Sequence, residues 1–157
     1  MTNSLLSQLP SPASKRIALR VSAPAERALR QNHPWVFDQA IIEQSHQGAP
    51  GDLAVIFDNK RRFLAIGLYD PTSPIRVRIL QHRQPATIDE NWFQTKIMAA
   101  SQIRKPLTQQ LTDGYRLIHG ENDGLHGLVI DRYAETLVLR IYSPSWIPHL
   151  KEFCSAL

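Results

Sequence analysis

Short apolar runs alternate with turn residues through the first half of this 157-residue chain. The strands that this pattern predicts cover residues 17–21, 53–57, 63–69 and 75–80. One short helix is expected at residues 24–30, since Pro24 suits a first helical turn and Pro34 pushes His33 out of the helical region. Many short strands with frequent Gly and Pro turns are typical of a small β-barrel or sandwich. We place this domain at residues 15–84.

A different pattern begins after residue 84. Thr87, followed three residues later by Glu90, has the form of a capping box and predicts the start of a helix that Pro106 closes. The apolar positions of this helix recur at spacings near 3.6 residues, which gives it one buried face. Three strands are then expected, at residues 115–118, 127–132 and 136–141. Residues 85–143 are therefore predicted to form a central α+β domain, with one helix and an antiparallel sheet.

The two ends of the chain lead to two further expectations. Residues 1–14 carry no charge and are rich in Ser, Leu and Pro, so we expect a flexible leader. Pro144 opens a second amphipathic helix, whose apolar stripe includes Trp146 and Phe153 and still continues at Leu157. We expect residues 144–157 to be the start of a truncated helix that leads to a further domain.

The positive charge is concentrated in the first domain. Residues 14–83 hold 11 Lys and Arg against 6 Asp and Glu, whereas residues 84–157 hold 7 against 8. A one-signed field on one domain favours a polyanion, because binding phosphates releases counterions; a basic surface without a partner is the alternative. The one cysteine excludes an internal disulfide, and no apolar run approaches the roughly 20 residues that span a bilayer. The cytoplasm is the expected location.

No complete catalytic site is found in the sequence. No Gly-x-Gly-x-x-Gly follows a strand, and Gly120–Gly127, the nearest approach, is better explained as a tight loop. His119 and His126 lack the spacing of zinc ligands, and Cys154 lies on the buried stripe of the last helix, where a cysteine is inert. We therefore predict no catalytic, cofactor-binding or metal-binding residue in this chain.

Basic side chains form a better candidate site. Residues 60–62 are expected at a hairpin tip, from which long cationic side chains reach phosphates without losing their hydration. Alternation along a strand and helical spacing place other arginines in pairs on one face. We expect Trp35 to belong to the core, although His33 and Trp35 could also stack on an unpaired base. The predicted RNA-binding residues are Arg27, Arg30, His33, Lys60, Arg61, Arg62, Arg76 and Arg78.

Two stretches resemble a known family. Residues 32–37, 51–53, 63–69 and 75–78 resemble the N-terminal PUA domain of S-adenosylmethionine-dependent methyltransferases similar to rRNA large subunit methyltransferase I, which act on cytosine C5 of ribosomal RNA. The second match is more specific: residues 120–133 resemble the glycine- and aspartate-rich hairpin of that family's central domain. His126 departs from this pattern, since proline is expected at its place.

The resemblance implies a three-part layout: a PUA-like β-barrel, a small α+β domain and a C-terminal Rossmann-like methyltransferase domain that these residues do not include. S-adenosylmethionine and the nucleophilic cysteine would belong to that third part, and Cys154 does not match the cysteine's context. The chain would bind ribosomal RNA, position it for the third domain and be inactive alone. The resemblance neither implies nor excludes a homodimer. The alternatives are a free-standing PUA-type RNA-binding adaptor and a protein-docking or dimerisation module.

Overall fold

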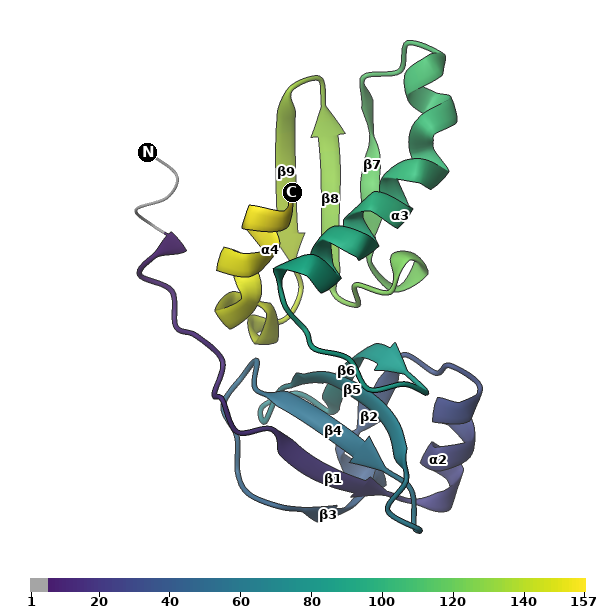
Figure 1. Cartoon of the computed structure of the whole chain (residues 1–157), viewed down its shortest axis with the longest axis vertical. Helices are drawn as coiled ribbons and strands as arrows, with labels where there is room; N and C mark the ends of the chain where they lie inside the picture. Colours follow the sequence, from purple (N-terminus) through teal and green to yellow (C-terminus); the bar gives the residue numbers. More distant parts are fainter. Residues whose placement is uncertain (1–5) are drawn as a thin grey trace. The chain divides into compact units, whose positions relative to one another are not determined.

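The computed structural model describes residues 6–157, which divide into two compact units (Figure 1). The first unit holds the described residues up to Ala86 together with Pro144–Lys151. The second unit holds Thr87–Ser143 and Glu152–Leu157. Among the described residues, no helix is both long and apolar enough to cross a membrane.

A curled six-stranded sheet forms the first unit (Figure 1). Its strand order is β2-β6-β5-β4-β1-β3, and the pairing is antiparallel except between β1 and β4. The elements of this unit are β1 (Ile17–Val21), α2 (Ala23–Arg30), β2 (Trp35–Phe37), the 3-10 helix η1 (Asp38–Ala40), β3 (Ile41–Gln44), β4 (Leu53–Phe57), β5 (Phe63–Tyr69) and β6 (Ile75–His82). The bounds of β1, β4 and β5 are those that the sequence predicts.

Alternating residues of these strands enclose the core of the first unit. Ile17, Leu19 and Val21 of β1 are buried, while Ala18 and Arg20 between them face outwards. Leu29 of α2 is 2% exposed and belongs to the same core. Trp35 does not, so the expectation that it is a core residue is wrong. The buried residue of β2 is Val36, because alternation allows only one side of such a short strand to face inwards.

The second unit is a helix and a three-stranded antiparallel sheet in the order β7-β8-β9. Its elements are α3 (Glu90–Gln109), β7 (Gly114–His119), the 3-10 helix η2 (Gly120–Asp123), β8 (Leu128–Tyr133), β9 (Thr136–Ile141) and the greater part of α4 (Leu150–Ala156). Phe93 of α3 meets Phe153 of α4 edge to face, with ring centroids 5.5 Å apart. The predicted α+β class, with a β-barrel-like domain and a small helix-plus-sheet domain, is confirmed.

The bounds of α3 differ from the prediction at both ends. The helix begins at Glu90, because the carboxylate of Asp89 accepts a hydrogen bond from the Trp92 N–H at 2.9 Å and so acts as the N-cap in place of Thr87. It also passes through Pro106 and ends at Gln109. Pro106 and the residue four before it, Gln102, are both exposed, so water can bond the carbonyl that the proline leaves free.

The last segment is not the single helix that the sequence predicts from residue 144. Pro144–His149 form a 3-10 helix, η3, and only Leu150–Ala156 are α-helical. Pro148 accounts for this, since a proline disfavours the α conformation of the residue before it. Within the first unit, the His149 ring bonds the Gly51 carbonyl at 2.7 Å. Gly51 has φ +91°, and a Cβ there would lie 2.6 Å from Pro148 Cγ, so only glycine suits this contact.

The predicted flexible leader at residues 1–14 falls partly outside the described residues, because residues 1–5 are not among them. Within the described part, the backbone N–H of Ala13 donates to Asp52 Oδ1 at 2.9 Å. Asp52 is itself buried and also accepts from the Ala49 N–H at 2.8 Å. The segment before β1 is therefore bonded to the first unit at Ala13.

Candidate nucleic-acid interface

The hairpin between β4 and β5 is organised by one buried carboxylate, that of Asp58. The Asp58 N–H bonds the Arg62 carbonyl at 2.9 Å, which leaves residues 59–61 as a three-residue loop. Oδ1 of Asp58 accepts from the backbone N–H groups of Lys60 and Arg62, both at 2.8 Å. Arg61 closes the loop with φ +59°, in the left-handed region that glycine usually occupies in such loops. A non-glycine residue thus occupies the left-handed position of this loop.

The same carboxylate joins the loop to helix α2. Oδ2 of Asp58 accepts from Arg62 Nε at 2.8 Å and from Arg30 Nη2 at 3.0 Å. Arg30 also bonds Glu26 one helical turn earlier. The backbone N–H of Arg62, helped by its guanidinium, holds the pKa of Asp58 below its usual value although burial opposes this. Asp58 is therefore a charged acceptor that fixes Arg30 and Arg62 in place.

Six basic residues gather around this loop, and Arg27 lies on α2 three residues before one of them, Arg30; we call these seven residues the tip surface. Nη1 of Arg20 bonds Asn59 Oδ1 at 3.4 Å, and Nη2 of Arg83 bonds the Arg30 carbonyl at 3.3 Å. The tip surface consists of Arg20, Arg27, Arg30, Lys60, Arg61, Arg62 and Arg83. Sequence reasoning missed Arg20 and Arg83. The outward position of Arg20 in an alternating strand was a signal for the first, but nothing in the sequence places Arg83 beside α2.

The members of the tip surface differ in whether their charged groups are already paired with a carboxylate. Arg62 and Arg30 are tied to Asp58, and Arg20 donates to Glu43 at 2.8 Å. Arg27, Lys60 and Arg61 are exposed, and no side chain within residues 6–157 pairs with their charged groups. These three cations are available to an anionic ligand without breaking any bond in the protein.

The remaining predicted residues lie elsewhere in the first unit. Arg76 and Arg78 are on β6 beside the far end of β5, where Leu68 pairs with Arg78, whereas Phe63 at the other end adjoins the tip. The length of β5 separates the two groups by roughly 20 Å. Arg78 is 8% exposed and lies 3.8 Å from the Asp70 carboxylate, so it does not fit the predicted contact with RNA. Arg76 is half-buried and bonds the carbonyls of Asp70 and Pro71.

Beside these arginines, three rings lie on the outer side of β2. The His33, Trp35 and Phe37 ring centroids are 6.0–6.3 Å apart, and Phe37 is 44% exposed. His33 Nδ1 lies 3.0 Å from the Trp35 carbonyl. Sequence reasoning named His33 and missed Phe37, although the two-residue spacing from His33 through Trp35 to Phe37 was visible. These rings form a second, aromatic surface that is distinct from the tip surface.

The glycine-rich loop of the second unit is held by an ion pair. Asp123 receives both Nη groups of Arg104 at 2.8 and 2.7 Å and the His119 N–H at 2.6 Å. Gly120, Gly124 and Gly127 have φ of +46°, +73° and +78°, which agrees with the interpretation as a tight loop. Among residues 6–157, no three His, Cys, Asp or Glu side chains converge on a metal position.

Cys154 lies on α4 and is half-buried. Burial raises the pKa of the Cys154 thiol, which disfavours the thiolate that a nucleophile requires.

Comparison with known proteins identifies the first unit. Residues 19–82 match the family described as PUA-like domain, so the class of this unit is a PUA-like domain. Over a longer span, the chain is similar to ribosomal RNA large subunit methyltransferases. It is 46% identical over 147 residues to one from Deinococcus radiodurans and 36% identical over 128 residues to ribosomal RNA large subunit methyltransferase I of Erwinia tasmaniensis. The resemblance seen in the sequence is confirmed.

These matches cover most of this chain and a minor part of its relatives. The chain is covered to 90% and 81%, but it spans about a third of the relatives' length, 36% and 32%. Among solved structures, one assigned to the SAM-dependent methyltransferases, from Streptococcus mutans, superposes on 88% of this chain with a TM-score of 0.76. That alignment is 16% identical and covers 36% of the other chain, so it supports the fold alone.

Proposed function

We propose that this chain is the RNA-binding part of an enzyme that methylates ribosomal RNA, and that its tip surface holds the RNA. The observation that carries the proposal is the presence of three unpaired cations in a PUA-like domain: Lys60 and Arg61 lie in the β4–β5 loop, and Arg27 lies on the helix that Asp58 joins to that loop. Cations kept free of carboxylates in a folded domain are suited to phosphates, because binding then costs no internal ion pair. The names of the relatives support ribosomal RNA as the ligand.

The finer assignment, to cytosine C5 of large-subunit ribosomal RNA, is part of the same proposal and comes from the family resemblance. In such chemistry a thiolate adds to the pyrimidine ring and makes C5 nucleophilic towards a methyl donor. The described residues do not fit that donor: no glycine-rich loop among them follows a strand and opens a helix, and Cys154 is a poor thiolate. We derive no methyl-transfer step from this chain, whose proposed role is to position the RNA.

A salt titration with single-stranded RNA tests the proposal. We expect the affinity of the full chain to fall steeply with salt. The double variant Lys60→Ala/Arg61→Ala should flatten the slope by about 0.7 for each phosphate that the variant no longer neutralises. Lys105→Ala/Lys151→Ala removes the same charge from exposed positions outside the tip surface and serves as the matched control. An affinity that hardly depends on salt, or equal effects in both double variants, would contradict the proposal.

A further inference from the structure

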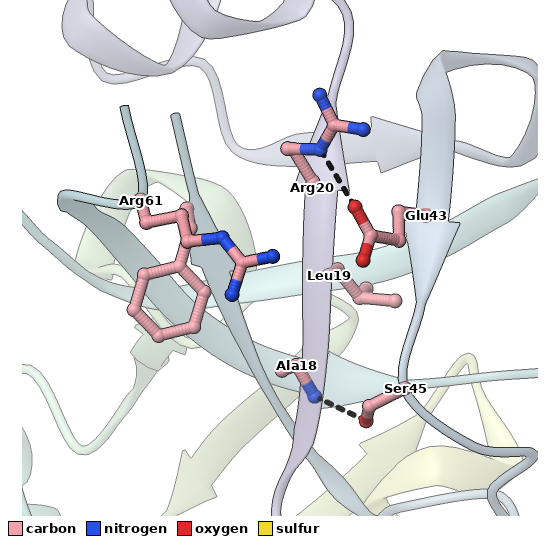
Figure 2. A pocket seen from close by; sticks show the side chains of 7 residues that line it. Ala18, Leu19, Arg20, Glu43, Ser45 and Arg61 are labelled. Carbon is pink, nitrogen blue, oxygen red and sulfur yellow. Dashed lines mark hydrogen bonds and ion pairs between the residues drawn. The ribbon is translucent and has the colours of Figure 1, made fainter. Parts of the chain in front are cut away.

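An open pocket lies on the outer face of β1, next to the tip surface (Figure 2). It has a volume of about 320 Å³ and is lined by Ala18, Leu19, Arg20, Glu43, Ser45, Phe57 and Arg61. This volume is at the lower end of the range for small-ligand sites, which suits a group the size of one nucleoside. The pocket contains Arg61, one of the free cations of the tip surface. It also contains Glu43, whose negative charge is not explained by attraction to phosphate.

The register of the sheet explains why a hollow forms here. Arg20 pairs with Phe57 on β4 and with Glu43 on β3, so these three side chains form a row across the outer face. In the next row the central residue is Ala18, whose N–H donates to Ser45 Oγ at 3.0 Å. A methyl group at the centre leaves space that longer neighbours on both sides enclose. The hollow therefore follows from the small size of one outward-facing residue.

The walls of the pocket have the chemistry that recognises a nucleobase. The Arg20 guanidinium is held by Glu43 at 2.8 Å and by Asn59 at 3.4 Å, so a planar cation is already fixed in orientation. An unpaired base stacks on such planes and on aromatic rings such as that of Phe57. Figure 2 shows the Arg61 guanidinium extending towards β1 from the opposite side to Glu43. There it can bind the phosphate next to a stacked base.

Glu43 gives the pocket a preference among bases. One of its carboxylate oxygens bonds Arg20, and the other has no partner within residues 6–157. A carboxylate accepts hydrogen bonds and cannot donate them, so it favours a base with an exocyclic amino group, as it does cytosine N4. Uracil presents a carbonyl at that place and would repel the carboxylate.

We infer that this pocket binds one unpaired, amino-bearing nucleobase of the RNA, with Arg20 and Phe57 as stacking surfaces and Glu43 as the acceptor. The inference rests on the proposed RNA-binding function and adds a specificity determinant to it. The tip surface supplies affinity for any strand, and the pocket selects the base that enters beside it.

The test compares two single-stranded probes, oligouridine and the same oligomer with one central cytidine, in anisotropy titrations of the full chain. We expect the cytidine probe to bind at least about fivefold more tightly. Glu43→Ala should bring this ratio close to one, because the acceptor for the amino group is lost; oligouridine, which has no amino group, is the reference probe for each variant. Ala18→Leu, which fills the hollow, should also remove the preference. Ala99→Leu, at an exposed alanine on α3, adds the same bulk elsewhere and should preserve it.

The outcomes separate the two proposals. A ratio near one in the unmodified chain, or a ratio unchanged in both Glu43→Ala and Ala18→Leu, would overturn the pocket inference. Salt-dependent binding of both probes would still support the tip surface in that case. If neither probe binds, the proposed RNA-binding function fails, and the pocket inference fails with it.

Discussion

Arg61 occupies a backbone conformation that its side chain does not favour, and the cost can be measured. Its φ of +59° is in the left-handed region, where a residue with a Cβ is less stable by about 1–2 kcal/mol. Glycine removes this strain but makes the unfolded chain more flexible, at a cost of about 0.4–1 kcal/mol. No side chain within the described residues pairs with the Arg61 guanidinium, so its removal breaks no ion pair. We therefore expect Arg61→Gly to stabilise the fold by about 0.5–1 kcal/mol.

Arg61→Ala separates strain from charge. Alanine lacks the guanidinium but keeps the Cβ, so it should be less stable than Arg61→Gly by the same amount, about 0.5–1 kcal/mol, while binding RNA equally weakly. The measurement is the free energy of unfolding in urea, followed by an RNA titration of each variant. Asn32→Gly is the control, because Asn32 also has a positive φ, 62°, but asparagine tolerates it. An alanine variant as stable as the glycine variant would refute the reasoning about strain.

Three other substitutions test the energetics of the fold. The lowered pKa of Asp58 means that its carboxylate contributes stability above about pH 4 that is lost as pH falls through the folded-state pKa. The urea midpoint of the unmodified chain should therefore fall more steeply in acid than that of Asp58→Asn. Pro106→Ala restores a helical N–H in the last turns of α3 and should stabilise the chain by about 1–2 kcal/mol in urea unfolding, and a lower stability would contradict this account. Asp123→Ala leaves the largely buried Arg104 guanidinium unpaired and should cost about 3 kcal/mol in thermal unfolding, whereas a cost below about 1 kcal/mol would mean that water already screens the pair.

The strands could be predicted from the sequence because their signals are local. Ile17–Val21 alternates apolar and other residues, and Phe63–Tyr69 is apolar almost throughout, which suits a strand in the middle of a sheet. The start of α3 also depends on local sequence, but two nearby residues, Thr87 and Asp89, could each serve as the N-cap. Thr87 with Glu90 fits the capping box, whereas the carboxylate of Asp89 reaches the Trp92 N–H. A pattern alone does not decide between neighbouring caps.

Burial of single side chains was harder to predict, because alternation shows which residues share a face and not which face is inside. Trp35 is the larger residue, yet the much smaller Val36 is the one enclosed. Arg78 shares a strand face with Arg76 but lies near the Asp70 carboxylate, which no local pattern pairs with it. Reading basic residues from the sequence therefore overestimates the number available to a ligand.

Long-range ion pairs decide which cations of the tip surface remain free. Asp58 lies 28 residues from Arg30 in the sequence and accepts hydrogen bonds from both Arg30 and Arg62. These two arginines therefore stabilise the hairpin. The same carboxylate bonds the backbone on both sides of Arg61, which holds that residue in its strained conformation. One buried acceptor thus both neutralises part of the surface and directs an unpaired guanidinium to the edge of the base-sized pocket. Glycine at position 61 would relieve the strain. A binding role for Arg61 predicts that the strain is nevertheless kept, because the residue faces the ligand.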